Sequence, residues 1–419
     1  MNPLFKRQHV LGIAAAALLI GCSGGESGTG MQANQTTTGE ITGFGSVYVN
    51  GIKFETNQAT VSIDGVPSSE NALSVGMVVT VTGSVDSDGV SGTANEISAK
   101  TEVEGLVFEN NIATGGTTIN VMGQIVKITN DTKFKSEVTS ITTIDQLIAN
   151  DTVVEVSGYS DGQGNIYATY IKALDSNEVK LHGVIQNLSG TNDNDSFTIG
   201  EINGEGGITV TFNAATTQFE DVTQDQLANG MYVSVESANY TSGTGAVLAS
   251  EIELEDDSSV GGSEVDVEGV VTDVTNIGAE EFKINGLLVK FDPGTTFIGG
   301  DQSNIELEVK LEVEGTVQSD NSILADEISF RVESDMEAEG EVTLVDKESN
   351  SFELNDDVLG TLTIVVNEFT SYEDEIDEDN RTFNFDDIVQ GMGIEAKYYV
   401  DSDNGNNIAT SIYKVLLEP

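Results

Sequence analysis

The sequence predicts an all-β protein that consists of five small β-barrels in tandem, with small β-sandwiches as the alternative. Three observations predict this fold class. Short runs alternate apolar and polar residues, as half-buried strands do, and are rich in Val, Ile and Thr. Similar runs recur along the chain. The pairs Asn50-Gly51 and Asn285-Gly286 stand between such runs, and Asn-Gly is the strongest short signal for a β-hairpin.

The N-terminal segment, residues 1–21, has the features of an export signal. Lys6 and Arg7 precede an apolar stretch from Val10 to Ile20. This stretch is too short to span a bilayer, and a small residue, Gly21, follows it. We therefore expect residues 1–21 to be a signal peptide.

The residues LIGC at positions 19–22 resemble the lipobox of bacterial lipoproteins. The resemblance implies that Cys22 carries a diacylglycerol thioether and an acylated amine, which together anchor the chain in a membrane. Otherwise Cys22, the only cysteine, is free or disulfide-bonded. Ser23 stands where an Asp commonly retains lipoproteins in the inner membrane, so the resemblance implies the outer membrane. Residues 22–38 are rich in Gly, Ser and Thr and should form a flexible tether with a reach on the order of 20 Å.

Each expected repeat opens with a strand that ends in a polar residue and a glycine. These glycines are Gly43, Gly105, Gly183, Gly269 and Gly340. We expect them at equivalent bends where the backbone needs a positive φ. A hairpin follows, and VYVNGIKF of residues 47–54 matches FKINGLLV of residues 282–289. The two Asn-Gly pairs should therefore occupy equivalent type I′ turns.

Two further strands complete each repeat. They are LSVGMVVTVTG of residues 73–83 and ANEI of residues 94–97 in the first copy. One helical turn should precede the former element, as at Ile144 to Ala149 in the second copy. The side chains expected inside the barrels include Val47, Val49, Val79, Val81, Ile284, Leu311 and Val313. The repeats should span residues 39–100, 101–175, 176–258, 264–332 and 334–416.

Taken together, these elements resemble the domain of unknown function 5666 family, most clearly in residues 39–100. The resemblance implies a small all-β domain that recurs in bacterial lipoproteins and secreted proteins, and it supplies no activity or cofactor. The strand count of each repeat independently suggests a barrel similar to the oligonucleotide/oligosaccharide-binding fold. Because each unit is small, we expect neighbouring repeats to be separate β units that pack on each other as a rod.

The charge balance argues against one class of partner. The chain has 70 Asp and Glu against 17 Lys and Arg, which gives a formal net charge of −53. A surface of this sign repels phosphate backbones, so we expect no nucleic-acid partner.

Few residues offer catalytic or metal chemistry. His182 is the only histidine after the signal peptide, and strand alternation places it with Lys180 on the solvent side, which argues against a triad or a zinc site. Carboxylates are too numerous for a glycosidase pair to be chosen. Short clusters contain oxygen ligands that Ca²⁺ prefers, but they lie where turns select Asp and Asn for backbone reasons. The candidate ligands are Asp86, Asp88, Asp401 and Asp403. We expect no cofactor, with calcium as the alternative.

These observations favour a non-enzymatic, lipid-anchored cell-envelope protein that acts as a scaffold or as a binding and display module. Its expected partners are the membrane, through acylated Cys22, and an envelope protein or polysaccharide. Two alternatives stay open: a calcium-dependent surface adhesin, and an envelope polysaccharide hydrolase that uses carboxylates. The expected location is the outer membrane, with the chain either periplasmic or surface-exposed.

Overall fold

The computed structural model describes most of the chain after the expected signal peptide. The described residues are 35–161, 163–176, 178–190, 195–202, 205–237, 246–255, 262–377, 380–402 and 404–417. They form strands and short 3-10 helices, so the predicted all-β class is confirmed. No helix in these ranges is long and apolar enough to cross a bilayer. The signal peptide, Cys22 and Asp403 lie outside the described residues.

The elements of the first two repeats follow a similar order along the chain. Repeat 1 comprises β1 (Gln35–Gly43), β2 (Val47–Val49), β3 (Ile52–Glu55), β4 (Thr60–Ile63), β5 (Val66–Ser68), η1 (Glu70–Ala72), β6 (Val78–Val85) and β7 (Ser91–Ala99). Repeat 2 comprises β8 (Val103–Asn110), η2 (Ile112–Thr114), β9 (Thr118–Val121), β10 (Gln124–Lys127), β11 (Lys133–Ser136), η3 (Ile144–Gln146), β12 (Val153–Ser160) and β13 (Asn165–Leu174).

The same order continues in the last three repeats. Repeat 3 comprises β14 (Val179–Val184), β15 (Gln186–Ser189), β16 (Asp195–Ile202), β17 (Glu205–Phe212), β18 (Gln218–Glu220), η4 (Gln224–Gln226), β19 (Tyr232–Ser237), β20 (Ala246–Leu248) and β21 (Glu251–Leu254). Repeat 4 comprises β22 (Glu264–Asp273), η5 (Ile277–Ala279), β23 (Glu281–Ile284), β24 (Leu287–Lys290), β25 (Thr296–Ile298), η6 (Gln302–Asn304), β26 (Lys310–Val317) and β27 (Ile323–Arg331). Repeat 5 comprises β28 (Met336–Asp346), β29 (Ser351–Asp356), β30 (Gly360–Val365), β31 (Ser371–Asp374), η7 (Phe385–Asp387), β32 (Gly393–Val400) and β33 (Asn407–Lys414).

Every repeat closes the same ring of strands. In repeat 4 the order is β22–β23–β24–β27–β26, and β26 pairs with β22 again. The corresponding rings are β1–β2–β3–β7–β6, β8–β9–β10–β13–β12 and β28–β29–β30–β33–β32. Repeat 3 keeps the order, with its first strand divided into β14 and β15 and its last into β20 and β21. The predicted barrels with one shared strand order are therefore confirmed.

Alternation along the strands fills the barrels with apolar side chains. The residues predicted to point inward are all at most 1% exposed: Val47, Val49, Val79, Val81, Ile284, Leu311 and Val313. In each repeat a 3-10 turn lies directly before one long strand of the ring, as predicted; these strands are β6, β12, β19, β26 and β32. In repeat 2 the turn covers Ile144–Gln146. Period-2 patterning was therefore enough to identify the core of each barrel.

Both Asn-Gly hairpins adopt the predicted turn. φ is 51° at Asn50 and 76° at Gly51, and it is 50° at Asn285 and 82° at Gly286. A type I′ turn needs positive φ at both central residues, and Asn and Gly adopt such values at the lowest cost.

The hairpin asparagine also explains the glycine in the first strand. Asn285 Nδ2 donates to Glu268 O at 3.1 Å, and Asn285 Oδ1 accepts from Val270 N at 2.9 Å. Between these two residues, a Cβ on Gly269 would lie 2.1 Å from Asn285 Nδ2. The side chain of the asparagine thus packs directly on the glycine backbone.

Two details of the predicted bends are wrong. None of the five predicted glycines has a positive φ, so the position does not need a left-handed backbone. A Cβ on Gly105, Gly269 or Gly340 would overlap a neighbouring atom, so at these three glycines the position excludes a side chain. In repeat 1 the equivalent residue is Gly39 and not Gly43, because a Cβ on Gly39 would lie 1.9 Å from Asn50 Oδ1. The sequence pattern suggested Gly43 because Thr42-Gly43 repeats the expected polar-glycine pair.

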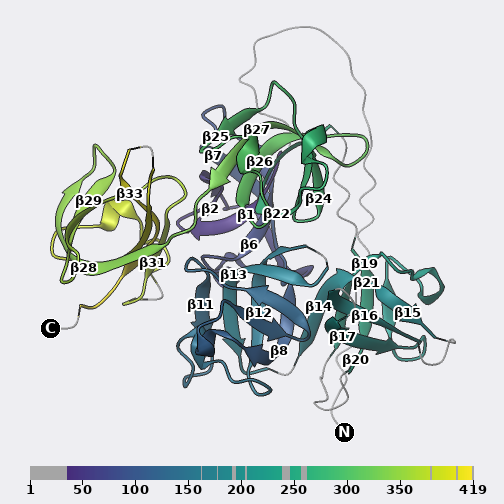
Figure 1. Ribbon diagram of the computed structural model, residues 1–419. Coiled ribbons are helices and arrows are strands. Elements are labelled where there is room, and N and C mark those ends of the chain that lie inside the picture. The colour runs from purple at the N-terminus through teal and green to yellow at the C-terminus, as the bar shows by residue number, and fades with distance from the viewer. Residues whose placement is uncertain are drawn as a thin grey trace.

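The predicted rod of separate units is also wrong, because two sheets run across repeat boundaries. Residues 36–38 of β1 pair in parallel with residues 265–267 of β22, which joins repeats 1 and 4. Residues 180–181 of β14 pair with residues 103–104 of β8, which joins repeats 2 and 3. Figure 1 shows repeat 4 in green beside the purple β1, and β14 of repeat 3 beside β8 of repeat 2. Strand β1 begins at Gln35, inside the expected tether, because residues 35–40 pair with β6 of the same repeat and residues 36–38 also pair with β22.

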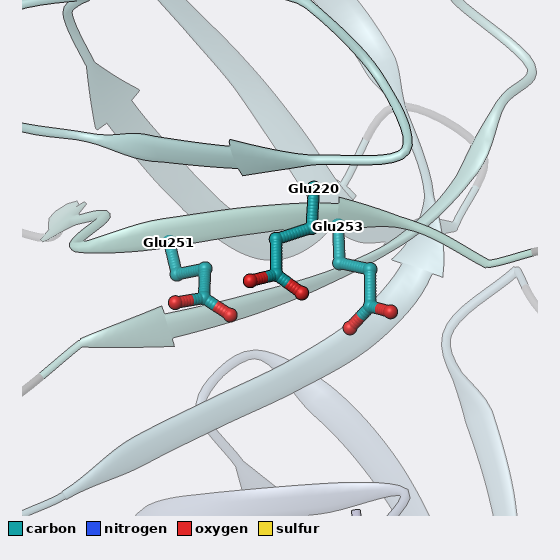
Figure 2. Close-up of side chains that lie close together, drawn as sticks. All are labelled: Glu220, Glu251 and Glu253. Carbon is teal, nitrogen blue, oxygen red and sulfur yellow. The ribbon is translucent and has the colours of Figure 1, made fainter. Parts of the chain in front are cut away.

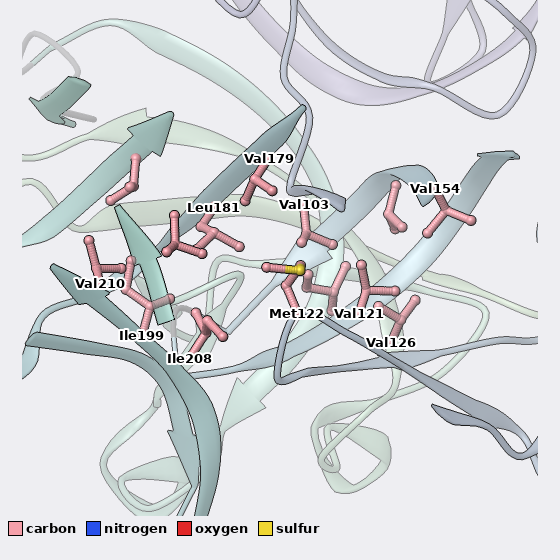
Figure 3. Packing of buried hydrophobic residues seen from close by; sticks show 14 of the residues in the cluster. Val103, Val121, Met122, Val126, Val154, Val179, Leu181, Ile199, Ile208 and Val210 are labelled. Atoms are coloured by element: carbon pink, nitrogen blue, oxygen red, sulfur yellow. The ribbon is translucent and has the colours of Figure 1, made fainter. Parts of the chain in front are cut away.

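Hydrophobic cores also cross repeat boundaries. Figure 3 shows Val103 and Met122 of repeat 2 in one cluster with Leu181 and Ile199 of repeat 3. Tyr170 of repeat 2 packs in the cluster of repeat 1, and its burial raises its pKa to about 12. Repeats 4 and 5 each have a cluster of their own. Sharing apolar surface stabilises units that are small for an independent core.

We predict that Gly269→Ala lowers the free energy of unfolding by ~1–3 kcal/mol, because the new Cβ overlaps Asn285 and displaces its side chain. The additional change Asn285→Gly removes that overlap and keeps a residue that tolerates positive φ. The double variant should therefore lose less stability than the sum of the two single variants.

Urea unfolding of the four proteins measures this coupling. Gly278→Ala is the matched control, because nothing lies within 4 Å of a Cβ at that position. Additive losses in the double variant would show that the contact between residues 269 and 285 is not the reason for the glycine.

Candidate binding site at the junction of the repeats

Basic side chains gather where the repeats meet. Lys6 and Arg7 precede the described residues, and nine of the other Lys and Arg side chains contact a different repeat. The nine are Lys100, Lys127, Lys133, Lys135, Lys180, Lys310, Arg331, Arg381 and Lys397. Since the chain has a net charge of −53, these contacts place positive charge between barrels that would otherwise repel each other.

Lys310 of repeat 4 lies at the centre of this network. Its Nζ is 3.1 Å from Glu40 Oε2 of repeat 1 and 3.1 Å from Glu268 Oε1 of repeat 4. Glu268 also accepts a hydrogen bond from the hydroxyl of Tyr159 in repeat 2. Three repeats therefore meet around one lysine and its two carboxylates.

Arg331 extends the network to repeat 5. Its guanidinium pairs with Glu312, and its Cζ lies 3.5 Å from the ring centre of Phe369. Asp266, on the strand that joins repeats 1 and 4, accepts from Asn50 Nδ2 at 2.8 Å. Charged and polar contacts thus link repeats 1, 2, 4 and 5 at one place.

Burial and charge separate the pKa values of the carboxylates in this network. Burial raises the pKa of Glu40 to about 7, against the opposing effect of Lys310. Burial acts on Glu268 as well, but Lys310 and Arg331 outweigh it and hold the pKa of Glu268 below its usual value. Burial raises the pKa of Asp266 well above its usual value. At neutral pH Glu268 is anionic, whereas Glu40 exchanges a proton near that pH.

A cavity of about 590 Å³ lies beside this network, and we call it the junction cavity. Its lining includes Thr42 of repeat 1, Tyr167 of repeat 2, Lys310 of repeat 4, and Phe369 and Tyr399 of repeat 5. The volume lies within the range of small-molecule sites, roughly 300–1,000 Å³. Since four repeats contribute to the wall, assembly of the repeats creates the cavity.

A second and larger cavity, of about 1030 Å³, lies between repeats 1, 2 and 5. Lys133 lines it and is buried. The Nζ of Lys133 donates to Ser371 Oγ at 2.9 Å, Ser411 Oγ at 2.6 Å and Tyr413 Oη at 2.7 Å. These bonds satisfy all three donors of the ammonium group and attach repeat 5 to repeat 2.

Comparison with known families identifies the repeating unit. The profile of the domain of unknown function DUF5666 matches residues 38–98, 104–172, 182–253, 268–329 and 339–413. The chain belongs to the DUF5666 family. No curated protein matches the chain. One solved structure similar to this chain, described as "drosophila Unr CSD456", has 14% identity and a TM-score of 0.14, and the match covers 57% of this chain and 97% of that chain. A TM-score of this size supports no argument about the DUF5666 protein.

The expectation that His182 is solvated is wrong, because it lies where DUF5666 repeats 1, 2 and 3 meet. Its side chain is 4% exposed, and its Nδ1 is 3.3 Å from Glu255 Oε1. Burial lowers the pKa of His182. Despite burial, His182 and Lys100 lower the pKa of Glu255 to about 2. Strand alternation correctly put His182 on the outer face of its barrel, but that face is an interface.

The expected calcium ligands lie in turns of two different DUF5666 repeats. Asp88 Oδ1 accepts from Val90 N and Ser91 N, both at 3.1 Å, and Asp86 Oδ2 accepts from Ser91 Oγ at 3.1 Å. These contacts lie in the turn between β6 and β7. Asp401 occupies the equivalent turn between β32 and β33, and its Oδ2 accepts from Asn404 Nδ2. In both turns the carboxylates bond to groups of the turn itself, and the structure does not bring the two turns together.

One carboxylate cluster in DUF5666 repeat 3 was not predicted. Glu220 of β18 lies beside Glu251 and Glu253 of β21, with one oxygen of each within 4.8 Å of the others (Figure 2). Burial raises the pKa of Glu253, and Glu255 and Glu220 add to the effect. Oxygen ligands of this kind suit a divalent cation. The parallel pairing of β18 with β21 creates the cluster, which residue spacing does not reveal.

The residues of the junction were also missed by sequence reasoning. Glu40, Tyr159, Lys310 and Arg331 come from four strands of three DUF5666 repeats. Each one lies on the outer face of its own barrel, where charged residues are normally solvated. The one signal available was the rarity of basic residues, 17 in 419.

We predict that the protein is more stable near pH 5 than near pH 8. Burial raises the pKa of Glu40, Glu155 and Glu395 to about 7 in each case. A carboxyl whose pKa is higher in the folded state binds more protons when folded. The amount that such a carboxyl adds to the free energy of unfolding is therefore full below its unfolded pKa, about 4.5. It is lost as the pH rises through the folded pKa, about 7. Glu255 acts in the opposite direction, but at pH values between about 2 and 4.5. The lowered pKa of buried His182 also opposes the trend below its ordinary value of 6.5, but it is one group against three carboxyls.

Urea midpoints measured from about pH 5 to pH 8 at constant ionic strength test this prediction. The variant Glu155→Gln/Glu395→Gln should show a shallower fall of the midpoint with pH. Glu109→Gln, at an exposed position, is the control and should keep the fall of the parent protein. A midpoint that rises from the acidic to the alkaline end would contradict the assignment.

Proposed function

We propose that the chain is a non-enzymatic, lipid-anchored cell-envelope protein whose five DUF5666 barrels act as one scaffold with a binding site at their junction. The observation that carries the proposal is the placement of the basic residues, nine of which join different repeats. Such contacts hold the barrels in one arrangement, and a scaffold needs a defined arrangement. They also maintain the junction cavity.

The anchor and the location in this proposal rest on the N-terminal residues. The lipobox-like residues at positions 19–22 support acylation of Cys22, and Ser23 supports the outer membrane. Strand β1 begins 13 residues after Cys22, at Gln35. The chain between Cys22 and Gln35 would span at most ~45 Å, so the scaffold would stay close to the bilayer. The expected partner is an envelope protein or polysaccharide.

We predict that Cys22→Ala releases the protein from the membrane, because the variant lacks the thiol to which the diacylglycerol is attached. Fractionation of cells followed by immunoblotting measures the distribution. Ser23→Ala is the matched control and should stay with the membranes. Unchanged membrane association of the Cys22 variant would refute the lipid anchor.

A second candidate function is hydrolysis of an envelope polysaccharide by carboxylates, and one observation favours it. Glu40 and Glu268 both line the junction cavity, and both contact Lys310. Their pKa values are shifted in opposite directions. Glycosidases use two carboxyl groups whose environments separate their pKa values in this way. We favour the first candidate because Lys310 and Tyr159 already bond to these carboxylates.

Incubation of the purified chain with envelope polysaccharides decides between the two candidates. We expect no increase in reducing ends. Release of reducing ends that Glu40→Gln or Glu268→Gln abolishes, with the melting temperature of the variant retained, would replace the scaffold proposal with the hydrolase. Turnover that survives both changes would point to a contaminating enzyme, which a repeat preparation by a different purification route would remove.

A further inference from the structure

The groups that remain available in the junction cavity are mainly hydroxyls. Within the described part of the chain, the hydroxyls of Thr42, Thr117 and Tyr399 hydrogen-bond to no other residue, although all three residues line the cavity. Each hydroxyl can both donate and accept. A ligand with hydroxyl groups of its own matches this set, because it also offers donors and acceptors in equal measure.

The cations of the cavity already pair with carboxylates, and only the Nε of Arg331 has no hydrogen-bond partner among the described residues. Lys127 Nζ lies 2.5 Å from Glu308 Oε1, Lys310 Nζ lies 3.1 Å from both Glu40 and Glu268, and Arg331 pairs with Glu312. A carboxylate, phosphate or sulfate on the ligand would have to compete with these pairs. It would also meet the carboxyl groups of Glu308 and Glu333 in the same wall. The charges in the wall therefore disfavour an anionic ligand.

Aromatic side chains supply the apolar part of the wall. Tyr167 and Tyr399 point outward from β13 and β32, since their neighbours Ile166 and Tyr398 are in the barrel cores. Both tyrosines are half-buried and line the cavity with Phe369. An amphipathic ring next to free hydroxyls suits a ligand that has apolar C–H faces and hydroxyl edges.

We propose that the junction cavity binds a neutral oligosaccharide. The inference rests on the binding role proposed above and selects polysaccharide as the class of partner. Hydroxyl groups of the sugar bond to Thr42, Thr117 and Tyr399, and a sugar face packs on the aromatic wall. A wholly apolar ligand would cover these hydroxyls and the adjoining charges without giving them partners, which is costly.

Isothermal titration calorimetry of the purified chain tests the proposal. The probes are the neutral oligomers maltoheptaose, cellohexaose, laminarihexaose and chitohexaose, and the acidic oligomers of galacturonate and chondroitin sulfate. We expect saturable binding of at least one neutral oligomer and none of the acidic ones. Tyr399→Phe and Thr42→Val remove one hydroxyl each with little change in volume. Each should weaken binding by up to about tenfold, as expected for the loss of one hydrogen bond.

Tyr48→Phe is the matched control, because Tyr48 is half-buried in repeat 1 and lines neither cavity. It should bind as the parent protein does. No binding of any neutral oligomer, tighter binding of an acidic one, or equal affinities for all three variants and the parent would each overturn the proposal. None of these outcomes would contradict the proposal that the chain is a non-enzymatic scaffold. Release of reducing ends in the same titrations would contradict that proposal.

Discussion

Attraction between a few basic side chains and many carboxylates is the interaction on which the assembly of this protein depends. The chain has a net charge of −53, so its barrels repel each other at long range. The ion pairs of Lys310 with Glu40, Lys180 with Asp64 and Lys100 with Glu255 join different repeats and overcome this repulsion locally. Buried charge pairs give little net stability compared with apolar contacts, but breaking one by removing a partner is costly. The basic residues therefore determine which barrels meet more than how stable each barrel is.

Strand β1 occupies a central position in this assembly. It closes the barrel of repeat 1 through β2 and β6, pairs in parallel with β22 of repeat 4, and contacts β31 of repeat 5. Its outward-facing Glu40 supplies one of the carboxylates of Lys310. The strand that follows the N-terminal segment is thus joined to three repeats. Any force that reaches the protein through its N-terminal segment acts first on this strand and its ladders.

The junction cavity is a consequence of how the barrels meet. Closed barrels leave few unpaired strand edges, and their outer surfaces are convex. Because convex surfaces touch over small areas, the barrels cannot pack together without gaps. At the junction those gaps are lined by outward-facing residues such as Tyr167, Tyr399 and Thr42. Four barrels can therefore create a concave site even though the inside of each one is filled with side chains. A tandem array of one small fold acquires in this way a kind of surface that its single unit lacks.

The sequence by itself determined the barrel, and the tertiary structure decided everything between barrels. Val79, Val81 and Ile284 alternate with polar residues, and two positive-φ turns are marked by Asn-Gly, so local sequence identified the core and the hairpins. The DUF5666 repeat could be recognised for the same reason, because these signals span only a few residues. His182 and Lys310 had equally clear strand positions, but a strand pattern says only that a residue faces outward. Whether that outward face meets water or another repeat depends on contacts between segments far apart in the sequence, such as β8 with β14 and β1 with β22, and no local pattern encodes them.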